Sequence, residues 1–271
     1  MSVVGGKKAP AELEFRMAEI RPYYSDKGLS AVHYDLTTAL DPALAGDIDI
    51  YASLAPPGGR VLELGAGTGR VAFALAERGL SVVGLDLAPA MLAQAQARLA
   101  KAAPEIVGRL SFVRGDMTAL PTGDPVDAVI CPYYGLAHLP AGAAWKNVFK
   151  GVAQRLKAGG LAAFHLPFGE RMAEAPPVQA GLPVFQSPLE GGRMLSIYIV
   201  ERAAKAAIGR YDQVLDYVVT DARGREENRA RERQTFYAAD PKPFAQAAGL
   251  AVDREPIVMG GVGAIHVFRR G

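Results

Sequence analysis

The chain has few of the residues that would build a disulfide scaffold or a metal site. It contains one cysteine, Cys131, among 271 residues, so no intrachain disulfide can form. The four histidines and this cysteine do not follow the spacing of a metal site. A single thiol is compatible with a reducing compartment, and we expect a cytoplasmic protein.

Long apolar runs and strong net charge are also lacking. No stretch approaches 18 uninterrupted apolar residues, which argues against a membrane-spanning helix. The first ten residues contain glycine and lysine and are not apolar, so we expect no signal peptide. A formal net charge of +2 gives no reason to expect nucleic acid or an anionic membrane as a partner.

Strand-like and helix-like segments alternate through the first two thirds of the chain. Short apolar strands are predicted over 60–64, 81–85, 110–113, 126–131 and 161–166, and helices over 12–22, 47–54, 69–77, 89–102 and 143–156. A turn is predicted over 157–160. This alternation predicts an α/β fold, a doubly wound, mostly parallel seven-stranded sheet with helices on both faces.

Beyond residue 167 the pattern changes to β-rich runs. Residues 194–200, 211–219 and 229–237 predict an antiparallel β-hairpin lid, followed by a helix over 240–248 and strands over 252–257 and 264–268. We therefore divide the chain into an N-terminal helical cap segment (1–54), a Rossmann-like cofactor-binding core (55–167), the lid (168–238) and the last helix and strands of the core (239–271). Such a lid could also pair between subunits of a homodimer.

A glycine-rich turn, Gly65-Ala66-Gly67-Thr68-Gly69, follows the strand over 60–64 and opens a helix. Glycines there let a backbone approach a ligand closely, although a tight strand-to-helix turn would use the same residues. Asp86 ends the next strand, where a carboxylate can accept hydrogen bonds from both ribose hydroxyls. It could instead stabilise the start of the following helix. Turn and spacing together predict a nucleoside site.

Arg70 distinguishes between two nucleoside cofactors. A dinucleotide fingerprint has Gly or Ala at this position, near the pyrophosphate. Glu63 can serve an ammonium group through water. Asp116 can accept from an adenine amino group and Met117 can pack on the ring, although Asp116 could also be an ordinary cap. These residues favour S-adenosylmethionine over NAD.

Four segments resemble the successive motifs of class I S-adenosylmethionine-dependent methyltransferases: VLELGAGTGR, VVGLDLAPAML, RGDMTALP and VDAVICPYYGLAHL. The resemblance covers about residues 55–166. Weaker matches at 31–35, 233–237 and 244–250 are similar to the branch of glycine and deoxyaminosugar N-methyltransferases, whose members carry a β-hairpin lid. The predicted cofactor-binding residues are Tyr34, Glu63, Gly65, Ala66, Gly67, Arg70, Asp86, Leu87, Met91, Gly115, Asp116, Met117, Cys131 and Pro132.

The same resemblance assigns two residues to the reacting end. His138 lies where related N-methyltransferases place a histidine near the acceptor, and an imidazole can take a proton from an ammonium or a hydroxyl. Tyr34 resembles a tyrosine whose hydroxyl lies close to the cofactor. Either side chain could instead be structural. Further candidates at this edge of the sheet are Tyr23, Tyr24, Tyr133, Tyr134 and His165.

The acceptor is expected to be a small molecule methylated on nitrogen or oxygen. Cys131-Pro132-Tyr133-Tyr134 departs from the motif of enzymes that methylate nucleic-acid bases, because a side-chain carbonyl is missing at its first position. The mixed charges over 223–233 predict a solvated hairpin face rather than an RNA-binding patch. Two alternatives stay open, a non-catalytic adenosylmethionine-binding domain and an NAD-dependent reductase. Arg70 and the lack of a Tyr-x-x-x-Lys pair disfavour the reductase.

Overall fold

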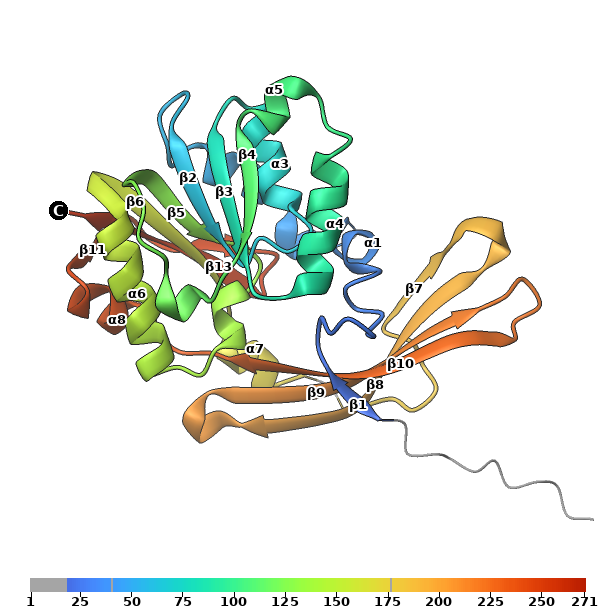
Figure 1. The fold of residues 1–271 in the computed structure, drawn as a ribbon. Coiled ribbons are helices and arrows are strands. Elements are labelled where there is room, and N and C mark those ends of the chain that lie inside the picture. Colours follow the sequence, from blue (N-terminus) through green and yellow to red (C-terminus); the bar gives the residue numbers. More distant parts are fainter. Residues whose placement is uncertain (1–18, 40, 176) are drawn as a thin grey trace, which may run out of the picture.

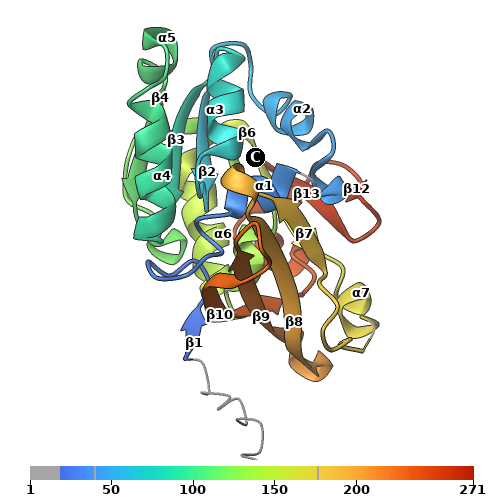
Figure 2. The same ribbon diagram turned by 90° about the vertical axis from the view of Figure 1, so that its right-hand side faces the viewer.

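The computed structural model describes residues 19–39, 41–175 and 177–271. Two β-sheets of different kinds organise them (Figure 1). A mostly parallel sheet is flanked by helices, and a mostly antiparallel sheet lies below it in the view of Figure 1. Helix α1 (Tyr34–Ala39) lies between the two sheets in both views (Figures 1 and 2).

The larger sheet has the strand order β11-β13-β6-β5-β2-β3-β4, and β12 adds an eighth strand beside β13. The pairs formed by β2 to β6 are parallel, whereas β13 is antiparallel to β6. The predicted doubly wound, mostly parallel sheet is confirmed, but the described residues form eight strands rather than seven, because the segment predicted as one strand over 252–257 contributes to two. Its strands are β2 (Arg60–Leu64), β3 (Ser81–Asp86), β4 (Leu110–Arg114), β5 (Val126–Cys131), β6 (Leu156–Pro167), β11 (Leu250–Val252), β12 (Ile257–Met259) and β13 (Gly263–Arg270).

Helices cover both faces of this sheet because its strands bury apolar side chains on both sides. Val129 and Ile130 of β5 belong to opposite buried clusters, one with Phe149 of α6 and the other with Phe73 of α3. The remaining helices are α2 (Asp47–Ala52), α3 (Arg70–Glu77), α4 (Pro89–Leu99), α5 (Pro104–Val107), α6 (Ala143–Arg155), α7 (Gly169–Ala173) and α8 (Lys242–Ala247).

The smaller sheet has the order β1-β10-β9-β8-β7. Its strands are β1 (Ile20–Pro22), β7 (Phe185–Pro188), β8 (Met194–Lys205), β9 (Arg210–Thr220) and β10 (Glu226–Tyr237). Strands β7 to β10 pair in antiparallel fashion and come from the predicted lid region, while β1 joins β10 in parallel. We call this sheet the lid sheet. Leu195 and Leu215 pack with Leu29, so the lid sheet also contacts the N-terminal part of the chain.

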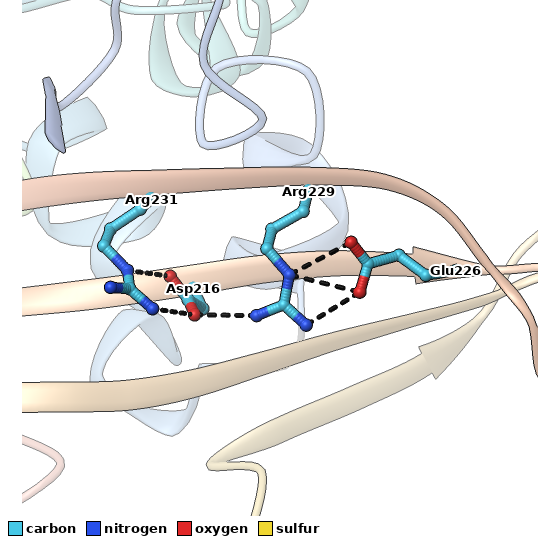
Figure 3. Close-up of polar contacts among 4 residues, drawn as sticks. All are labelled: Asp216, Glu226, Arg229 and Arg231. Carbon is cyan, nitrogen blue, oxygen red and sulfur yellow. Dashed lines mark hydrogen bonds and ion pairs between the residues drawn. The ribbon is translucent and has the colours of Figure 1, made fainter. Parts of the chain in front are cut away.

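Arginines of β10 form ion pairs along the lid sheet (Figure 3). Asp216 of β9 is buried, and its Oδ1 lies 2.6 Å from Nε of Arg231, the residue directly opposite. Arg229 donates to the same carboxylate at 2.8 Å and also pairs with Glu226. These two arginines are therefore engaged by carboxylates of their own sheet.

Three local predictions need correction. The helix predicted over 12–22 falls partly outside the described residues, and Ile20–Pro22 is a strand because it pairs with β10. The segment predicted as one strand over 252–257 is not a strand throughout. Strand β11 ends at Val252, and strand β12 begins at Ile257. The turn predicted over 157–160 lies inside β6, where the pairing with β5 is irregular. Val126 pairs with Leu156 and Ala128 pairs with Leu161, so the residues between them in β6 outnumber those in β5.

The described residues include no helix with both the length and the apolar character that crossing a membrane requires.

Candidate cofactor and acceptor site

A cavity of about 420 Å³ opens at the carboxyl ends of the parallel strands. Its wall combines residues that follow β2, β3, β4 and β5 with Pro22 to Ser25 and Tyr34 from the N-terminal part of the chain. Open α/β sheets bind their ligands at this edge, because the loops after parallel strands converge there.

Most of the predicted cofactor residues line this cavity: Tyr34, Glu63, Gly65, Ala66, Gly67, Arg70, Asp86, Leu87, Met91, Gly115, Asp116, Met117 and Pro132. Cys131 does not. Its side chain is fully buried in the core of the sheet, and burial raises the pKa of its thiol to about 12. The position of Cys131 therefore gives no support to its assignment as a cofactor ligand.

The glycine-rich turn forms one side of the cavity with left-handed backbone angles. Gly65 has φ of 71° and Gly67 has φ of 58°, a region in which side chains are strained. A Cβ atom on Gly67 would lie 3.1 Å from Cε of Met91, and one on Gly65 would lie 3.6 Å from Cε of Met117. Because both methionines line the cavity, side chains on the turn would narrow it.

Asp86 lines the cavity and stabilises the start of the following helix. Its Oδ2 accepts the backbone N–H of Gly67 at 2.7 Å, and its Oδ1 accepts that of Ala88 at 2.8 Å, where α4 begins. Burial raises the pKa of this carboxyl, and the backbone hydrogen bonds oppose that shift. Each oxygen keeps a second lone pair, so the carboxylate can still accept from ligand hydroxyls.

Glu63 brings a buried carboxyl group to the cavity wall. Only 2% of the residue is exposed, and its Oε2 has no hydrogen-bond partner among the described residues. Burial raises the pKa of Glu63 to about 8, although the nearby Arg70 cation lowers it. A buried polar atom without a partner is costly, and a ligand cation would satisfy it. The ammonium group of S-adenosylmethionine fits this requirement.

Arg70 and Asp116 are already engaged by protein groups. Both Nη atoms of Arg70 donate to the buried carboxylate of Asp47, at 3.0 and 2.5 Å, which ties α3 to the start of α2. Oδ1 of Asp116 accepts from the backbone N–H and the hydroxyl of Thr118, at 2.8 Å each. Both residues line the cavity, but each also holds local structure.

A second part of the cavity wall is aromatic, and Tyr34 connects it to the glycine-rich turn, because a Cβ atom on Gly67 would lie 3.9 Å from Cε1 of Tyr34. We call its five rings the aromatic wall: Tyr23, Tyr24, Tyr34, Tyr133 and His138. The rings of Tyr24 and Tyr34 lie 5.8 Å apart, and those of Tyr24 and His138 lie 6.0 Å apart. Tyr24 and Tyr133 have φ of 59° and 41°, and strained backbone of this kind often marks functional sites. The charged residues of the cavity wall, in contrast, are Glu63, Arg70, Asp86 and Asp116, near the glycine-rich turn.

His138 ends a short 3-10 turn, Gly135–His138, and its ring lies 4.8 Å from that of Phe236. Burial lowers the pKa of His138 to about 4, although a hydrogen bond that the ring donates to the backbone of Thr235 opposes the shift. The imidazole is therefore neutral near pH 7. In a neutral ring one nitrogen donates and the other accepts, so the second nitrogen is available as an acceptor.

Tyr34 is also held in its protonated form. Burial raises its pKa above the ordinary value, so the hydroxyl keeps its proton and can donate a hydrogen bond. The next residue, Asp35, accepts from Oγ1 of Thr68 at 2.5 Å and thereby ties α1 to the glycine-rich turn. In the sequence, the weak motif match at residues 31–35 pointed to this part of the chain.

The other candidate residues differ in whether they line the cavity. Tyr133 lines the cavity and donates its hydroxyl to Asp41 at 2.5 Å, a contact that no motif indicated. Tyr134 does not line the cavity, and its ring lies 4.6 Å from that of His165. His165 is fully buried, and burial lowers its pKa to about 4. Tyr134 and His165 therefore lie behind the cavity wall.

Comparison with known proteins gives a consistent assignment for the core. Residues 61–160 match the methyltransferase domain family. The chain is 34% identical over 129 residues to YqeM of Bacillus subtilis, which is provisionally named a methyltransferase, and the match covers 47% of this chain and 50% of that protein. This chain thus spans about half the length of the curated relatives it matches.

Solved structures share the whole fold. The CcbJ methyltransferase of Streptomyces caelestis superposes with a TM-score of 0.71 at 20% identity, covering 92% of this chain and 98% of that one. CalS10 of Micromonospora echinaspora, described as an amino pentose methyltransferase with S-adenosylmethionine bound, gives 0.64 at 21% identity, covering 89% and 96%. The predicted resemblance to class I S-adenosylmethionine-dependent methyltransferases is confirmed for the domain over 61–160 and for the fold.

Proposed function

We propose that this protein is an S-adenosylmethionine-dependent methyltransferase that methylates the nitrogen of a small-molecule amine. The methyltransferase domain over 61–160 supports the activity. The cavity wall has charged side chains around the glycine-rich turn, which we call the polar end, and a cluster of aromatic rings around Tyr24 and His138, which we call the aromatic end, and these two parts support the two binding positions. S-adenosylmethionine supplies an electrophilic methyl group on a sulfonium. The residues of this chain hold the reactants in line.

The polar end is the proposed cofactor position. The turn at Gly65 and Gly67 leaves room for close approach, and Asp86 accepts from the ribose hydroxyls. The carboxylate of Glu63 pairs with the ammonium group. The apolar side chains of Leu87, Met91 and Met117 surround the base, with Gly115, Asp116, Ala66 and Pro132 completing this part of the wall.

The aromatic end is the proposed acceptor position. With a pKa of about 4, His138 is a weak base. Transfer of a proton to it from an alkylammonium, whose pKa resembles that of lysine at about 10.4, would be uphill by on the order of 9 kcal/mol. We therefore assign His138 a positioning role, in which its neutral ring accepts a hydrogen bond from an amine that has lost its extra proton to solvent. Tyr34 donates to or orients the same nucleophile.

The lowered pKa of His138, which follows from its burial, favours nitrogen over oxygen. An aliphatic hydroxyl must lose its proton to become a good nucleophile, and an imidazole with a pKa of about 4 gives little help. An unprotonated amine needs no base before attack. Because CalS10 is described as an amino pentose methyltransferase, amino sugars are the first class to test.

The remaining features are consistent with this proposal. We propose that the lid region over 168–238 helps to exclude water from the reaction, because its residues Tyr217 and Phe236 contact Tyr23 and His138 of the cavity wall. A cytoplasmic location and a homodimer remain our expectations from the sequence.

The test is a labelled-methyl transfer assay with matched amines, phenols and alcohols, including amino sugars. We expect transfer to amines, at a rate that increases as the pH approaches the pKa of the amine. Gly67→Val, which narrows the cavity at Met91, is the control and should abolish cofactor binding in calorimetry. Transfer restricted to hydroxyl acceptors would contradict nitrogen methylation. Cofactor binding without transfer to any acceptor would favour a non-catalytic domain, and binding of NADH instead would favour a reductase.

A further inference from the structure

A fully buried carboxylate lies on the lid sheet, outside the cavity wall. Glu232 of β10 has no exposed surface. Its Oε1 accepts the backbone N–H groups of Leu29 and Ser30, at 2.7 and 3.0 Å, and its Oε2 accepts the hydroxyl of Ser30. Hydrogen bonds to a carboxylate are stronger than those between neutral groups. Glu232 therefore attaches the turn at residues 28–30 firmly to the lid sheet.

Gly28 makes this approach feasible. A Cβ atom at this position would lie 2.6 Å from Oε2 of Glu232, closer than real side-chain contacts allow. The chain thus has a residue without a side chain where the buried carboxylate needs space.

The same contact leads to the aromatic wall. The hydroxyl oxygen of Ser30 accepts the backbone N–H of Tyr24 at 2.9 Å. The backbone N–H of Tyr23 donates to the carbonyl of Arg233, the residue after Glu232, at 3.2 Å. The hydroxyls of Tyr23 and Tyr217 lie 3.0 Å apart. Both tyrosines that face His138 are therefore held by bonds that end on β9 and β10.

The N-terminal part of the chain is also bound to the core. The hydroxyl of Thr68 donates to Asp35, and Nε2 of Gln94 donates to the carbonyl of Ala31 at 2.7 Å. Residues 20–39, which we call the N-terminal segment, therefore have contacts to the lid sheet on one side and to the glycine-rich turn on the other. A shift of the segment at Glu232 would move Tyr23 and Tyr24 relative to His138.

We propose that Glu232 is a positioning residue for the acceptor. By holding the turn at residues 28–30, it fixes Tyr23 and Tyr24 beside His138. The identification of that end as the acceptor position rests on the proposed function. The attachment of the N-terminal segment does not, and it can be measured without any acceptor.

The test variant is Glu232→Gln, because an amide has the same shape but one fewer acceptor oxygen and no charge. Glu227→Gln is the matched control, since Glu227 is an exposed residue of the same strand. Amide hydrogen exchange of the full chain gives the first measurement. We expect at least a tenfold faster exchange over residues 23–34 in Glu232→Gln, with unchanged exchange over 61–90 and in the control.

Kinetics give the second measurement. We expect kcat/KM for the amine to fall about 10–100-fold, since small misplacements of reacting groups have effects of this size. The Kd for S-adenosylhomocysteine should stay within about threefold. If Glu232→Gln does not fold, Ser30→Ala replaces it as the test variant. This substitution removes only the hydroxyl between Glu232 and Tyr24, and it should give the same pattern with smaller changes.

Unchanged exchange over 23–34, or an increase spread over the whole chain, would overturn the proposal. Local exchange without any loss of kcat/KM in an active enzyme would also overturn it. A wild-type protein that methylates no acceptor would contradict the proposed function alone, because the exchange measurement would still show whether Glu232 holds the segment.

Discussion

His138 shows how burial changes the chemistry of a residue that a motif identifies. An exposed imidazole titrates near pH 6.5, which suggested proton transfer. Enclosed by Tyr23, Tyr24 and Phe236, the ring has a pKa of about 4 and stays neutral over the physiological range. In our proposal the same side chain therefore acts as a hydrogen-bond acceptor rather than as a base.

This role predicts the behaviour of His138→Ala. Loss of one hydrogen bond to the nucleophile should lower kcat/KM about 10–100-fold, equivalent to about 1.4–2.8 kcal/mol. Because protonation begins only near a pKa of about 4, the ratio of wild-type to variant rates should stay constant between about pH 6 and pH 9. His266→Ala, on β13 outside the cavity wall, is the control. A ratio that changes around about pH 6.5 would identify a titrating base instead.

At the scale of elements, the β9–β10 hairpin combines apolar packing on one face with ion pairs on the other. Leu215 and Tyr217 pack toward Leu29, whereas Asp216 between them receives Arg229 and Arg231 (Figure 3). Side chains alternate along a strand, so one short run supplies both surfaces. The ion pairs thus fix the pairing of the two strands that hold the N-terminal segment.

Asp216→Asn should therefore destabilise the protein. A buried carboxylate that accepts from two arginines is replaced by an amide, whose NH₂ group faces guanidinium donors, and the cost should be about 1–3 kcal/mol. Chemical denaturation monitored by circular dichroism measures the change in the free energy of unfolding. Asp221→Asn, at the exposed end of the hairpin beside Arg225, should cost less than about 1 kcal/mol. Equal losses in both variants would show that burial of the Asp216 pairs adds no stability.

Elements defined by local signals were predictable, and those that depend on distant pairing were not. The helix after Gly69 and the strand ending at Asp86 follow from apolar spacing and from glycine. Residues 20–22 carry no such signal. They form a strand only because β10, about 200 positions later, provides the partner. The break between Val252 and Ile257 similarly depends on how each half pairs with β13.

At the scale of the whole molecule, the two ends of the cavity differ in how far the sequence reveals them. Apart from Pro132, the polar end is built within residues 63–117, where each strand is followed directly by a loop of the cavity wall, and the residues predicted there do line the cavity. The aromatic end joins Tyr23 and Tyr24 to the loop at His138. Its arrangement depends on Glu232, which binds a backbone 203 positions away. Contacts over that distance leave no spacing that a single sequence can show.

Cofactor binding at the polar end should stabilise the whole molecule in a pH-dependent way. At 100 times its Kd, S-adenosylhomocysteine should add about 2.7 kcal/mol to the free energy of unfolding, which corresponds to an increase in Tm of about 5–10 °C. With a pKa raised to about 8 in the free protein, Glu63 is mostly protonated below that pH. Pairing with the ligand ammonium requires the carboxylate, so binding must displace a proton, and affinity should rise up to tenfold per pH unit from about pH 6.5 to pH 8.

Thermal denaturation with and without the ligand, at one fixed ligand concentration, measures this effect. The ligand-induced increase in Tm should be smaller at about pH 6.5 than at pH 8, by the equivalent of about 1.6 kcal/mol. Subtracting the ligand-free Tm at each pH removes the titration of other groups, including the buried histidines. Glu63→Gln cannot titrate, so its increase should be smaller and should not grow over this interval. The amino group of the ligand is the same in both proteins, so the difference between them isolates Glu63. Parallel pH dependence in the two proteins would mean that Glu63 does not pair with the ligand, and the orphaned Oε2 would then need another explanation.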